Sequence, residues 1–202
     1  MIIGPKYKIA RRLKAPIFEK TQTQKFAMRE ARKTKSKSRE RPKTDYGLQM
    51  TEKQKARMFY GVSEKQFAKY VIGALAKKGA SPATSLLTTL ERRLDNVVWR
   101  AGLLPTHRAA RQAVSHGHFL VNSKKVYVPS YSVKKGDVVS IREGSKGSKM
   151  FAHLNESEEN KINPPVWLSW NKEKRELDVQ DSAIESTELL FDLGQVIEFY
   201  QR

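Results

Sequence analysis

The chain has 202 residues, with 39 lysines and arginines against 21 aspartates and glutamates, which gives a formal net charge of +18. This length suits one or two small domains, and such an excess of positive charge is typical of proteins that bind a polyanion. The absence of cysteine excludes disulfides and thiolate zinc sites. The longest apolar stretches fall far short of the ~20 residues that cross a bilayer, so we expect no membrane partner.

Positive charge is spread unevenly along the chain. Residues 1–43 and residues 44–152 each carry a net charge of +12, whereas residues 153–202 carry a net charge of −6. We expect the basic body to lie on RNA, and the acidic C-terminal segment to meet a basic neighbouring protein.

Residues 1–43 read as a basic N-terminal arm. Residues 33–43 contain almost no apolar side chain, so this segment has little to bury. We therefore expect the arm to be extended, locally helical and ordered chiefly on binding RNA. A solvated charge run is the alternative for residues 33–43.

Two capping boxes predict where the next helices begin. Thr51 with Gln54, and Ser63 with Gln66, have the spacing at which a cap hydroxyl and a side-chain amide satisfy opposing backbone donors. The second helix ends near Gly79. Its core face consists of Phe67, Tyr70, Val71, Ala74 and Leu75.

A longer helix is predicted from Ser81, as N-cap before Pro82, to Gly102. Its buried stripe consists of Leu87, Leu90, Leu94, Val97, Val98 and Ala101. A second row, which we expect to face outward, consists of Arg93, Asn96 and Arg100. The three- and four-residue spacing of both rows is the basis of this prediction.

A further helix begins after Thr106 as N-cap and ends at Gly117. Its buried side consists of Ala109, Ala110, Ala113 and Val114. Its polar side consists of Arg108, Arg111, Gln112 and Ser115. Small buried residues let two helices approach closely, so we expect the two arginine rows to lie near one another at phosphate spacing.

Strands are predicted after the two helices. Residues 118–122 and 126–128 flank the polar turn Asn122-Ser123-Lys124-Lys125, whose lysines we expect at the tip of a hairpin. Residues 134–137 form a turn, and residues 138–141 form a third strand.

The last third of the chain contains another hairpin. Residues 166–170 and 177–179 flank the polar turn 171–174, and its tryptophans are expected to fill a core more often than to stack on bases. Residues 189–200 show no clean period.

Catalytic motifs are missing. The sequence has no cysteine nucleophile, no G-x-S-x-G elbow and no H-E-x-x-H helix, so we expect no enzyme, no cofactor and no metal. His116 and His118 could offer two metal ligands, but a phosphate or backbone hydrogen bond is the favoured use. Residues 144–147 have G-x-x-G spacing in a context that fits neither a KH loop nor a P-loop, and they are expected to form an exposed basic loop.

Residues 90–98 resemble the opening of the RNA-binding domain named after small-subunit ribosomal protein S-four. Their sequence is Leu-Glu-Arg-Arg-Leu-Asp-Asn-Val-Val. The pattern continues through residues 108–118, 121–122, 126, 129–131 and 136–142. Residues 45–49, 52–55, 60–62 and 65–67 resemble the bacterial-type S-four family itself. The match runs from residue 4 to residue 200.

This resemblance implies an α+β fold with three parts. They are the basic arm at residues 1–43, a helical domain made of residues 44–87 and 183–202, and an inserted S-four-type RNA-binding domain at residues 88–182. In the inserted domain two helices pack on a small, mostly antiparallel sheet. The resemblance also implies that residues 189–200 return to the helical domain. Many members hold zinc with four cysteines in the arm, the first near Tyr7, but here packing and RNA must hold the arm instead.

The resemblance implies a structural constituent of the small ribosomal subunit, in the cytoplasm or in an organelle. Such a protein binds the 5′ domain of small-subunit ribosomal RNA early, nucleates assembly and helps translational accuracy. Its implied partners are this RNA, ribosomal protein S-five, other small-subunit proteins, and messenger RNA near the channel by which it enters. The alternative is an RNA-modifying enzyme or a ribosome-rescue factor that carries the same domain.

The predicted RNA-binding residues come from all three parts. They are Arg92, Arg93, Asn96, Arg100, Thr106, Arg108, Arg111, Gln112, Ser115, His116, His118, Asn122, Lys124 and Lys125 in the inserted domain, Lys53, Lys55 and Arg57 in the helical domain, and Lys6, Lys8, Arg11 and Arg12 in the arm.

Overall fold

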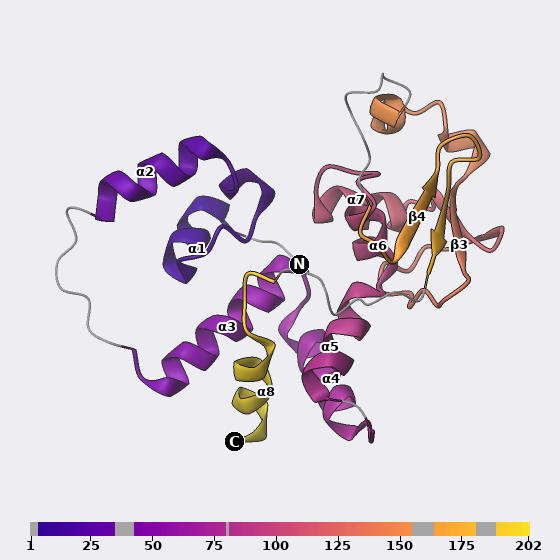
Figure 1. Cartoon of the computed structure of the whole chain (residues 1–202). Helices are drawn as coiled ribbons and strands as arrows, with labels where there is room; N and C mark the ends of the chain where they lie inside the picture. Colours follow the sequence, from indigo (N-terminus) through magenta and orange to yellow (C-terminus); the bar gives the residue numbers. More distant parts are fainter. Residues whose placement is uncertain (1–3, 35–42, 80, 155–163, 181–188) are drawn as a thin grey trace. The chain divides into compact units, whose positions relative to one another are not determined.

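The computed structural model describes residues 4–34, 43–79, 81–154, 164–180 and 189–202 (Figure 1). The chain divides into two compact units, the first made of Met1–Leu86 with Glu188–Arg202 and the second of Leu87–Thr187. The second unit is therefore inserted between two parts of the first. Helices occur in both units and a five-stranded antiparallel sheet in the second, which confirms the predicted α+β class.

Unit 1 is helical. Its elements are α1 (Lys6–Leu13), the 3-10 turn η1 (Glu19–Thr21), α2 (Gln24–Thr34), α3 (Asp45–Phe59), α4 (Glu64–Ala76), the first half of α5 (Pro82–Glu91) and α8 (Leu193–Gln201). The predicted N-cap of α4 is confirmed, since the Ser63 side chain accepts a hydrogen bond from the backbone N–H of Gln66.

The helix predicted to have Thr51 as its N-cap begins seven residues earlier. Thr44 is the N-cap of α3 and accepts a hydrogen bond from the Gly47 N–H, whereas Thr51 lies inside the helix. The Thr51 hydroxyl donates to the carbonyl of Gly47, 2.7 Å away. A threonine hydroxyl that can bond back to the preceding turn does not need a helix end, so the capping-box spacing at Thr51 was misleading.

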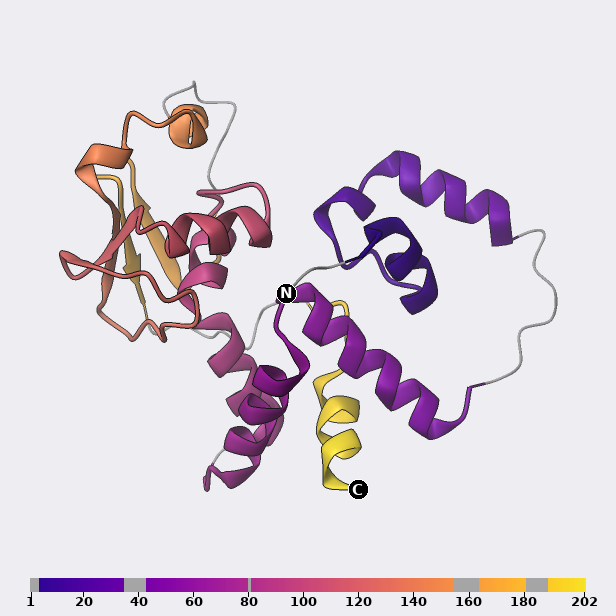
Figure 2. The ribbon, with the colours of Figure 1, turned by 180° about the vertical axis from the view of Figure 1, so that it is seen from behind.

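The C-terminal helix α8 packs on α3 and α4, as the resemblance implied for residues 189–200 (Figures 1 and 2). Just before α8, the Phe191 ring lies 5.6 Å from the Phe59 ring and 6.0 Å from the Tyr60 ring, centroid to centroid. The aromatic contacts bury the end of α3 and fix the start of α8.

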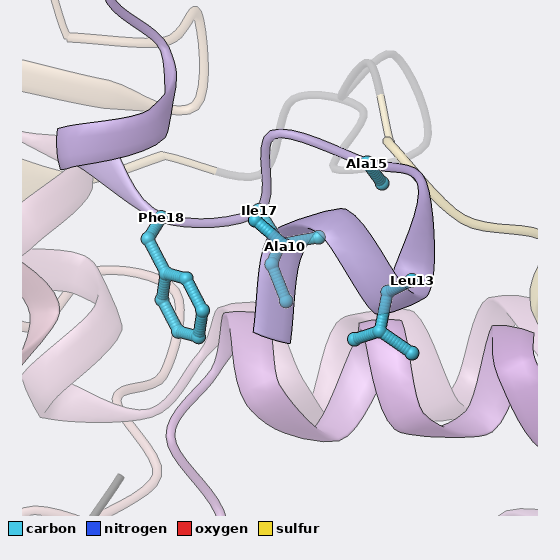
Figure 3. Packing of buried hydrophobic residues seen from close by; sticks show 5 residues of the cluster. All are labelled: Ala10, Leu13, Ala15, Ile17 and Phe18. Atoms are coloured by element: carbon cyan, nitrogen blue, oxygen red, sulfur yellow. The ribbon is translucent and has the colours of Figure 1, made fainter. Parts of the chain in front are cut away.

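The N-terminal segment is more than an extended arm. Its five buried apolar residues gather into one cluster (Figure 3). Phe26 of α2 and Met58 of α3 pack against this cluster. The cluster consists of Ala10, Leu13, Ala15, Ile17 and Phe18. These apolar residues lie between basic ones, so a helix and a tight turn can bury them on one side while the charges stay outside. Most of residues 33–43 lies outside the described residues.

The described residues of unit 2 contain two further helices, two 3-10 segments and the sheet. Its elements after α5 are α6 (Leu94–Arg100), α7 (His107–Ser115), β1 (Phe119–Val121), β2 (Lys124–Lys125), β3 (Val138–Ile141), η2 (Glu143–Ser145), η3 (Lys149–Leu154), β4 (Leu168–Asn171) and β5 (Glu176–Val179). The strand order is β2-β1-β3-β5-β4, with every neighbouring pair antiparallel. The predicted third strand and C-terminal hairpin are confirmed, and Trp167 is buried in the core.

The single helix predicted for residues 81–102 is two helices. Arg93 has extended backbone angles between α5 and α6 and forms an isolated β-bridge with Ser132. On either side, the Leu94 N–H donates to the Tyr131 carbonyl and the Val133 N–H donates to the Arg92 carbonyl. The helix breaks because a distant segment offers these backbone groups other partners.

The first hairpin is tighter than predicted. Asn122 and Ser123 both have positive φ, 49° and 65°, and form a two-residue turn, so Lys124 and Lys125 lie in β2 rather than at the tip. Asparagine tolerates this conformation, which matches the twist of paired strands. The predicted strand at residues 126–128 is wrong, because those residues continue past β2 without regular structure.

We expect Leu13→Ala to lower the free energy of unfolding by about 2–5 kcal/mol, because it leaves a cavity in the N-terminal cluster. Denaturation in urea, without RNA or zinc, measures this. Ile72→Ala is the matched control, since Ile72 is 63% exposed on α4 and should change stability by less than about 0.5 kcal/mol. Equal stability of Leu13→Ala and the unsubstituted chain would contradict the packing of this segment.

Candidate nucleic-acid interface

A buried polar cluster lies where α5 meets α6. The Arg93 guanidinium donates to both carboxylate oxygens of Asp95, at 2.6 and 3.0 Å, and both residues are buried. The Asn96 side chain donates to the Glu91 carboxylate at 2.7 Å. Arg100 donates to both Glu91 oxygens, at 2.8 and 3.1 Å. We call these five residues the α5–α6 polar cluster.

The predicted outward row is therefore wrong for Arg93 and Asn96, each only 1% exposed, while Arg100 is half-buried. The prediction assumed one unbroken helix, and the break at Arg93 turns α6 away from that register. Glu91 has no exposed surface, and a buried carboxylate is stable only when hydrogen-bonded donors surround it. Asn96 and Arg100 supply those donors.

Burial raises the pKa of the Asp95 carboxyl, while Arg93 and, more weakly, Arg111 oppose this shift by favouring its ionised form. Arg111 belongs to α7, so its field reaches the polar cluster from the neighbouring helix. The electrostatics of α6 and α7 are thus coupled.

The polar side of α7 is exposed, as predicted. Thr106 caps the helix by accepting from the Ala109 N–H at 3.1 Å, and α7 packs on α6. The buried residues are Ala110, Ala113 and Val114, while Ala109 is half-exposed. The outer residues are Arg108, Gln112, Ser115 and His116, with Arg111 half-buried.

Exposed lysines continue this surface onto the hairpin. Lys124 and Lys125 are exposed in β2. Asn122 is also exposed, but its side chain is occupied: it donates to Asp137 at 2.8 Å and accepts from the Val138 N–H at 2.9 Å. Its observed contacts fix the turn beside the lysines.

His118 is tied to the loop that follows β3. Its Nδ1 lies 2.9 Å from the Ser145 hydroxyl oxygen, and the Arg142 Nε donates a hydrogen bond to the same oxygen. Ser145 is buried, so the expectation of a fully exposed loop at residues 144–147 is wrong at this position. Burial, followed by the fields of His116, Arg142 and Lys125, lowers the pKa of the His118 ring. The ring is therefore mainly neutral at pH 7.

The predicted basic residues of α3 have carboxylate partners. Lys53 is 6% exposed, and its ammonium lies 2.6 Å from the Glu64 carboxylate and 4.4 Å from the Phe199 ring centroid. Arg57 lies 3.2 Å from Glu64, and Lys55 lies 2.6 Å from Glu52. Although burial raises the pKa of the Glu64 carboxyl, Lys53 and Arg57 outweigh it and hold that pKa below its usual range.

The predicted RNA-binding residues of α1 form two groups, those with a carboxylate partner and those on the exposed surface. Lys6 lies 3.7 Å from Glu19, and Arg11 lies 2.8 Å from Glu30. Lys8 and Arg12 are exposed. In the described parts of both units, then, several predicted cations are already partly neutralised within the protein.

Two family models together match most of the chain. The one described as "Ribosomal protein S4/S9 N-terminal domain" matches residues 1–91, and the one described as "S4 domain" matches residues 92–139. "Small ribosomal subunit protein uS4" of Halothermothrix orenii is 44% identical over 160 residues, covering 79% of this chain and 76% of its own. The protein of the same name from Chromobacterium violaceum is 41% identical over 206 residues, covering 99% and 98%. The chain belongs to the uS4 family.

A third relative, "Small ribosomal subunit protein uS4c" of Oltmannsiellopsis viridis, is 43% identical over 163 residues, covering 78% of each chain. These relatives are named as ribosomal proteins, which supports a structural role in the ribosome. The expected location, on a ribosome in the cytoplasm or in an organelle, agrees with the uS4 names. Across the described residues no helix has both the length and the apolar character needed to cross a membrane.

The zinc site that the uS4 resemblance implies does not fit this chain. Its four thiolate ligands are missing because there is no cysteine. Near the expected first ligand, the Tyr7 ring instead lies 5.7 Å from the Phe26 ring, centroid to centroid. Among the residues that the structure describes, no three histidines and acids are grouped for a metal ion.

We expect Asp95→Ala to lower the free energy of unfolding by about 3–5 kcal/mol, because it removes the carboxylate opposite the buried Arg93 guanidinium. Arg108→Ala, which truncates an exposed cation on α7, is the control and should cost less than about 0.5 kcal/mol. Urea denaturation followed by circular dichroism compares the two. A small loss for Asp95→Ala would contradict the structural role of the cluster.

The lowered pKa of His118 predicts a pH dependence of stability. The unfolded chain takes up a proton as the pH falls below about 6.5, while the folded site resists it, so stability is full above that pH and decreases below it. His118→Asn removes this titration and should flatten the decline between about pH 6.5 and pH 5. Unfolding free energies measured across that range test this, and equal slopes would contradict it.

Proposed function

We propose that the chain is a structural constituent of the small ribosomal subunit that binds the 5′ domain of small-subunit ribosomal RNA directly. It binds early, nucleates assembly and helps translational accuracy, and it is not an enzyme. The observation that carries the RNA contact is the exposed polar side of α7 together with the lysines of β2. We call this set the α7–β2 surface: Arg108, Arg111, Gln112, Ser115, His116, Lys124 and Lys125.

The physics of phosphate binding supports this surface. Side chains three and four residues apart on a helix are neighbours, so Arg108, Arg111 and Gln112 can contact consecutive phosphates of one strand. Each contact releases condensed counterions, and that release favours binding. The N-cap and the close packing on α6 hold α7 rigidly, which suits recognition of RNA shape more than of base sequence.

The predicted contacts divide by burial. Arg93 and Asn96 are buried and stabilise α6. Arg100 forms an ion pair with Glu91, so its charge is already partly neutralised. In unit 1, the exposed residues Lys8 and Arg12 are proposed as RNA contacts. Weaker RNA contacts are proposed for the remaining predicted residues, which are Arg92, Lys55, Arg57, Lys6 and Arg11. Lys53 is proposed as a core residue. Thr106, His118 and Asn122 act by fixing the surface.

A cavity on unit 1 supports contact with a basic protein. It has a volume of about 530 Å³, and α3, α8 and the two residues that flank α8 line it. The lining residues are Asp45, Leu48, Gln49, Asp192, Gln195, Glu198 and Arg202. Gln49 donates to Glu198 at 3.0 Å, and its own carbonyl oxygen is buried without a hydrogen-bond partner. The carboxylates of Asp45, Asp192 and Glu198 suit a lysine or arginine of a neighbour, proposed as ribosomal protein S-five. The contact with messenger RNA rests on the family resemblance alone.

We expect the triple variant Arg108→Ala, Arg111→Ala, Lys124→Ala to bind a transcript of the 5′ domain more weakly. Each lost phosphate contact should remove about one unit from the slope of log K against log salt, about three units in all. Titration at several salt concentrations measures the slope.

The matched control removes the same charge elsewhere, with Lys149→Ala, Lys172→Ala and Lys174→Ala, all exposed. An unchanged slope in the first variant, or equal changes in both, would contradict the assignment. Sedimentation separates the rival functions: a structural component stays with small subunits through a high-salt wash in one-to-one amounts, whereas an enzyme or rescue factor is lost.

A further inference from the structure

An exposed aromatic ring lies within the basic surface of unit 2. Tyr127 is 54% exposed, and the Lys125 ammonium lies 4.7 Å from its ring centroid. Tyr127 was not among the predicted site residues, because the sequence shows only an apolar run there. The structure shows instead that its ring is held against the C-terminal end of α7.

Glycine at position 117 allows this arrangement. Gly117 ends α7 with a φ of +69°, and a Cβ atom there would lie 2.7 Å from Cε1 of Tyr127 and 2.6 Å from Cε of Lys125. Any other residue would be strained at this φ and would push both side chains away from the helix end. The ring and the lysine stem thus lie directly against the backbone at the helix end.

The backbone around Tyr127 is held on both sides. Before it, the Val126 N–H donates to the Phe119 carbonyl, and after it, the Pro129 carbonyl accepts from the Asp95 N–H at 3.1 Å. The fixed backbone carries two exposed apolar side chains, Tyr127 and the 55%-exposed Val128. A ring fixed in advance loses little conformational freedom when a ligand stacks on it.

Lysines accompany this ring. The Lys125 ammonium lies over it, and Lys124 is exposed in the same strand as Lys125. An exposed aromatic ring beside lysines is the usual recognition pattern for an unpaired nucleotide, because the base stacks while its phosphate meets the ammonium. An apolar side chain of a protein partner would gain nothing from these cations.

We propose that Tyr127 is a stacking platform for one unpaired nucleobase of the bound RNA, with Lys125 contacting the adjacent phosphate. This inference rests on the proposed RNA binding by unit 2, and it adds a specificity for RNA that has an unpaired nucleotide at this position. The arginines of α7 read phosphate positions, whereas Tyr127 requires an unstacked base next to them. A fully paired helix cannot supply one.

The test uses the full-length chain and a transcript of the 5′ domain. Tyr127→Leu should weaken binding about tenfold without changing the salt slope, because stacking releases no counterions. Tyr127→Phe should retain affinity within about twofold, since the ring remains. Lys125→Gln should weaken binding and reduce the slope by about one unit. Tyr46→Leu is the matched control, because Tyr46 is 51% exposed on α3 and should leave binding unchanged.

Ultraviolet crosslinking gives a second readout. In the complex of the unsubstituted chain, mass spectrometry should find a nucleotide attached to Tyr127, and a fully duplex RNA of similar length should give no such product. This measurement does not depend on any variant being folded, and equal thermal unfolding midpoints check the variants.

Three outcomes would overturn the proposal. If the transcript binds equally to the unsubstituted chain and Tyr127→Leu, with no crosslink at Tyr127, the stacking platform is refuted while RNA binding stands. If Tyr127→Leu impairs only incorporation into subunits with the other proteins present, the ring contacts a protein. If the unsubstituted chain shows no salt-dependent binding to the transcript, the proposed function itself fails.

Discussion

The hydrogen bonds around the Glu91 carboxylate are the constraint on which the architecture of unit 2 depends. A carboxylate without exposed surface is costly unless donors surround it, and Asn96 and Arg100 reach it from α6. That requirement fixes α6 relative to the end of α5. A second buried pair, Arg93 with Asp95, closes the break between the helices.

The position of α6 in turn decides what α7 can present. Because Ala110 and Ala113 are small and buried, α7 lies close to α6, and its opposite side carries exposed polar groups. The αL residue Gly117 then ends the helix and leaves room for Lys125 and Tyr127. The placement of the α7 cations and of the aromatic ring thus follows from a buried network.

Charge has two different uses in this chain. In unit 1, Lys53 and Arg57 converge on Glu64, where Tyr200 from α8 also donates a hydrogen bond, so these cations tie three helices together. In unit 2, Lys124 and Lys125 are exposed. A net charge of +18 is consistent both with cations in internal ion pairs and with cations on the surface. The burial of each side chain distinguishes the two groups.

The sequence by itself determined the kind of partner, the α+β class, and those elements whose signals are local. Ser63 and Thr106 were found as N-caps, and the small-residue side of α7 was largely found, because capping and helical spacing act within a few residues. The tertiary structure decided what depends on distant partners. The break at Arg93 arises from residues near Ser132, and the burial of Lys53 arises from Glu64 and Phe199. A local pattern gives the face on which a side chain lies along its own helix. Whether that face meets solvent, a carboxylate or another backbone is decided by segments that the pattern does not contain.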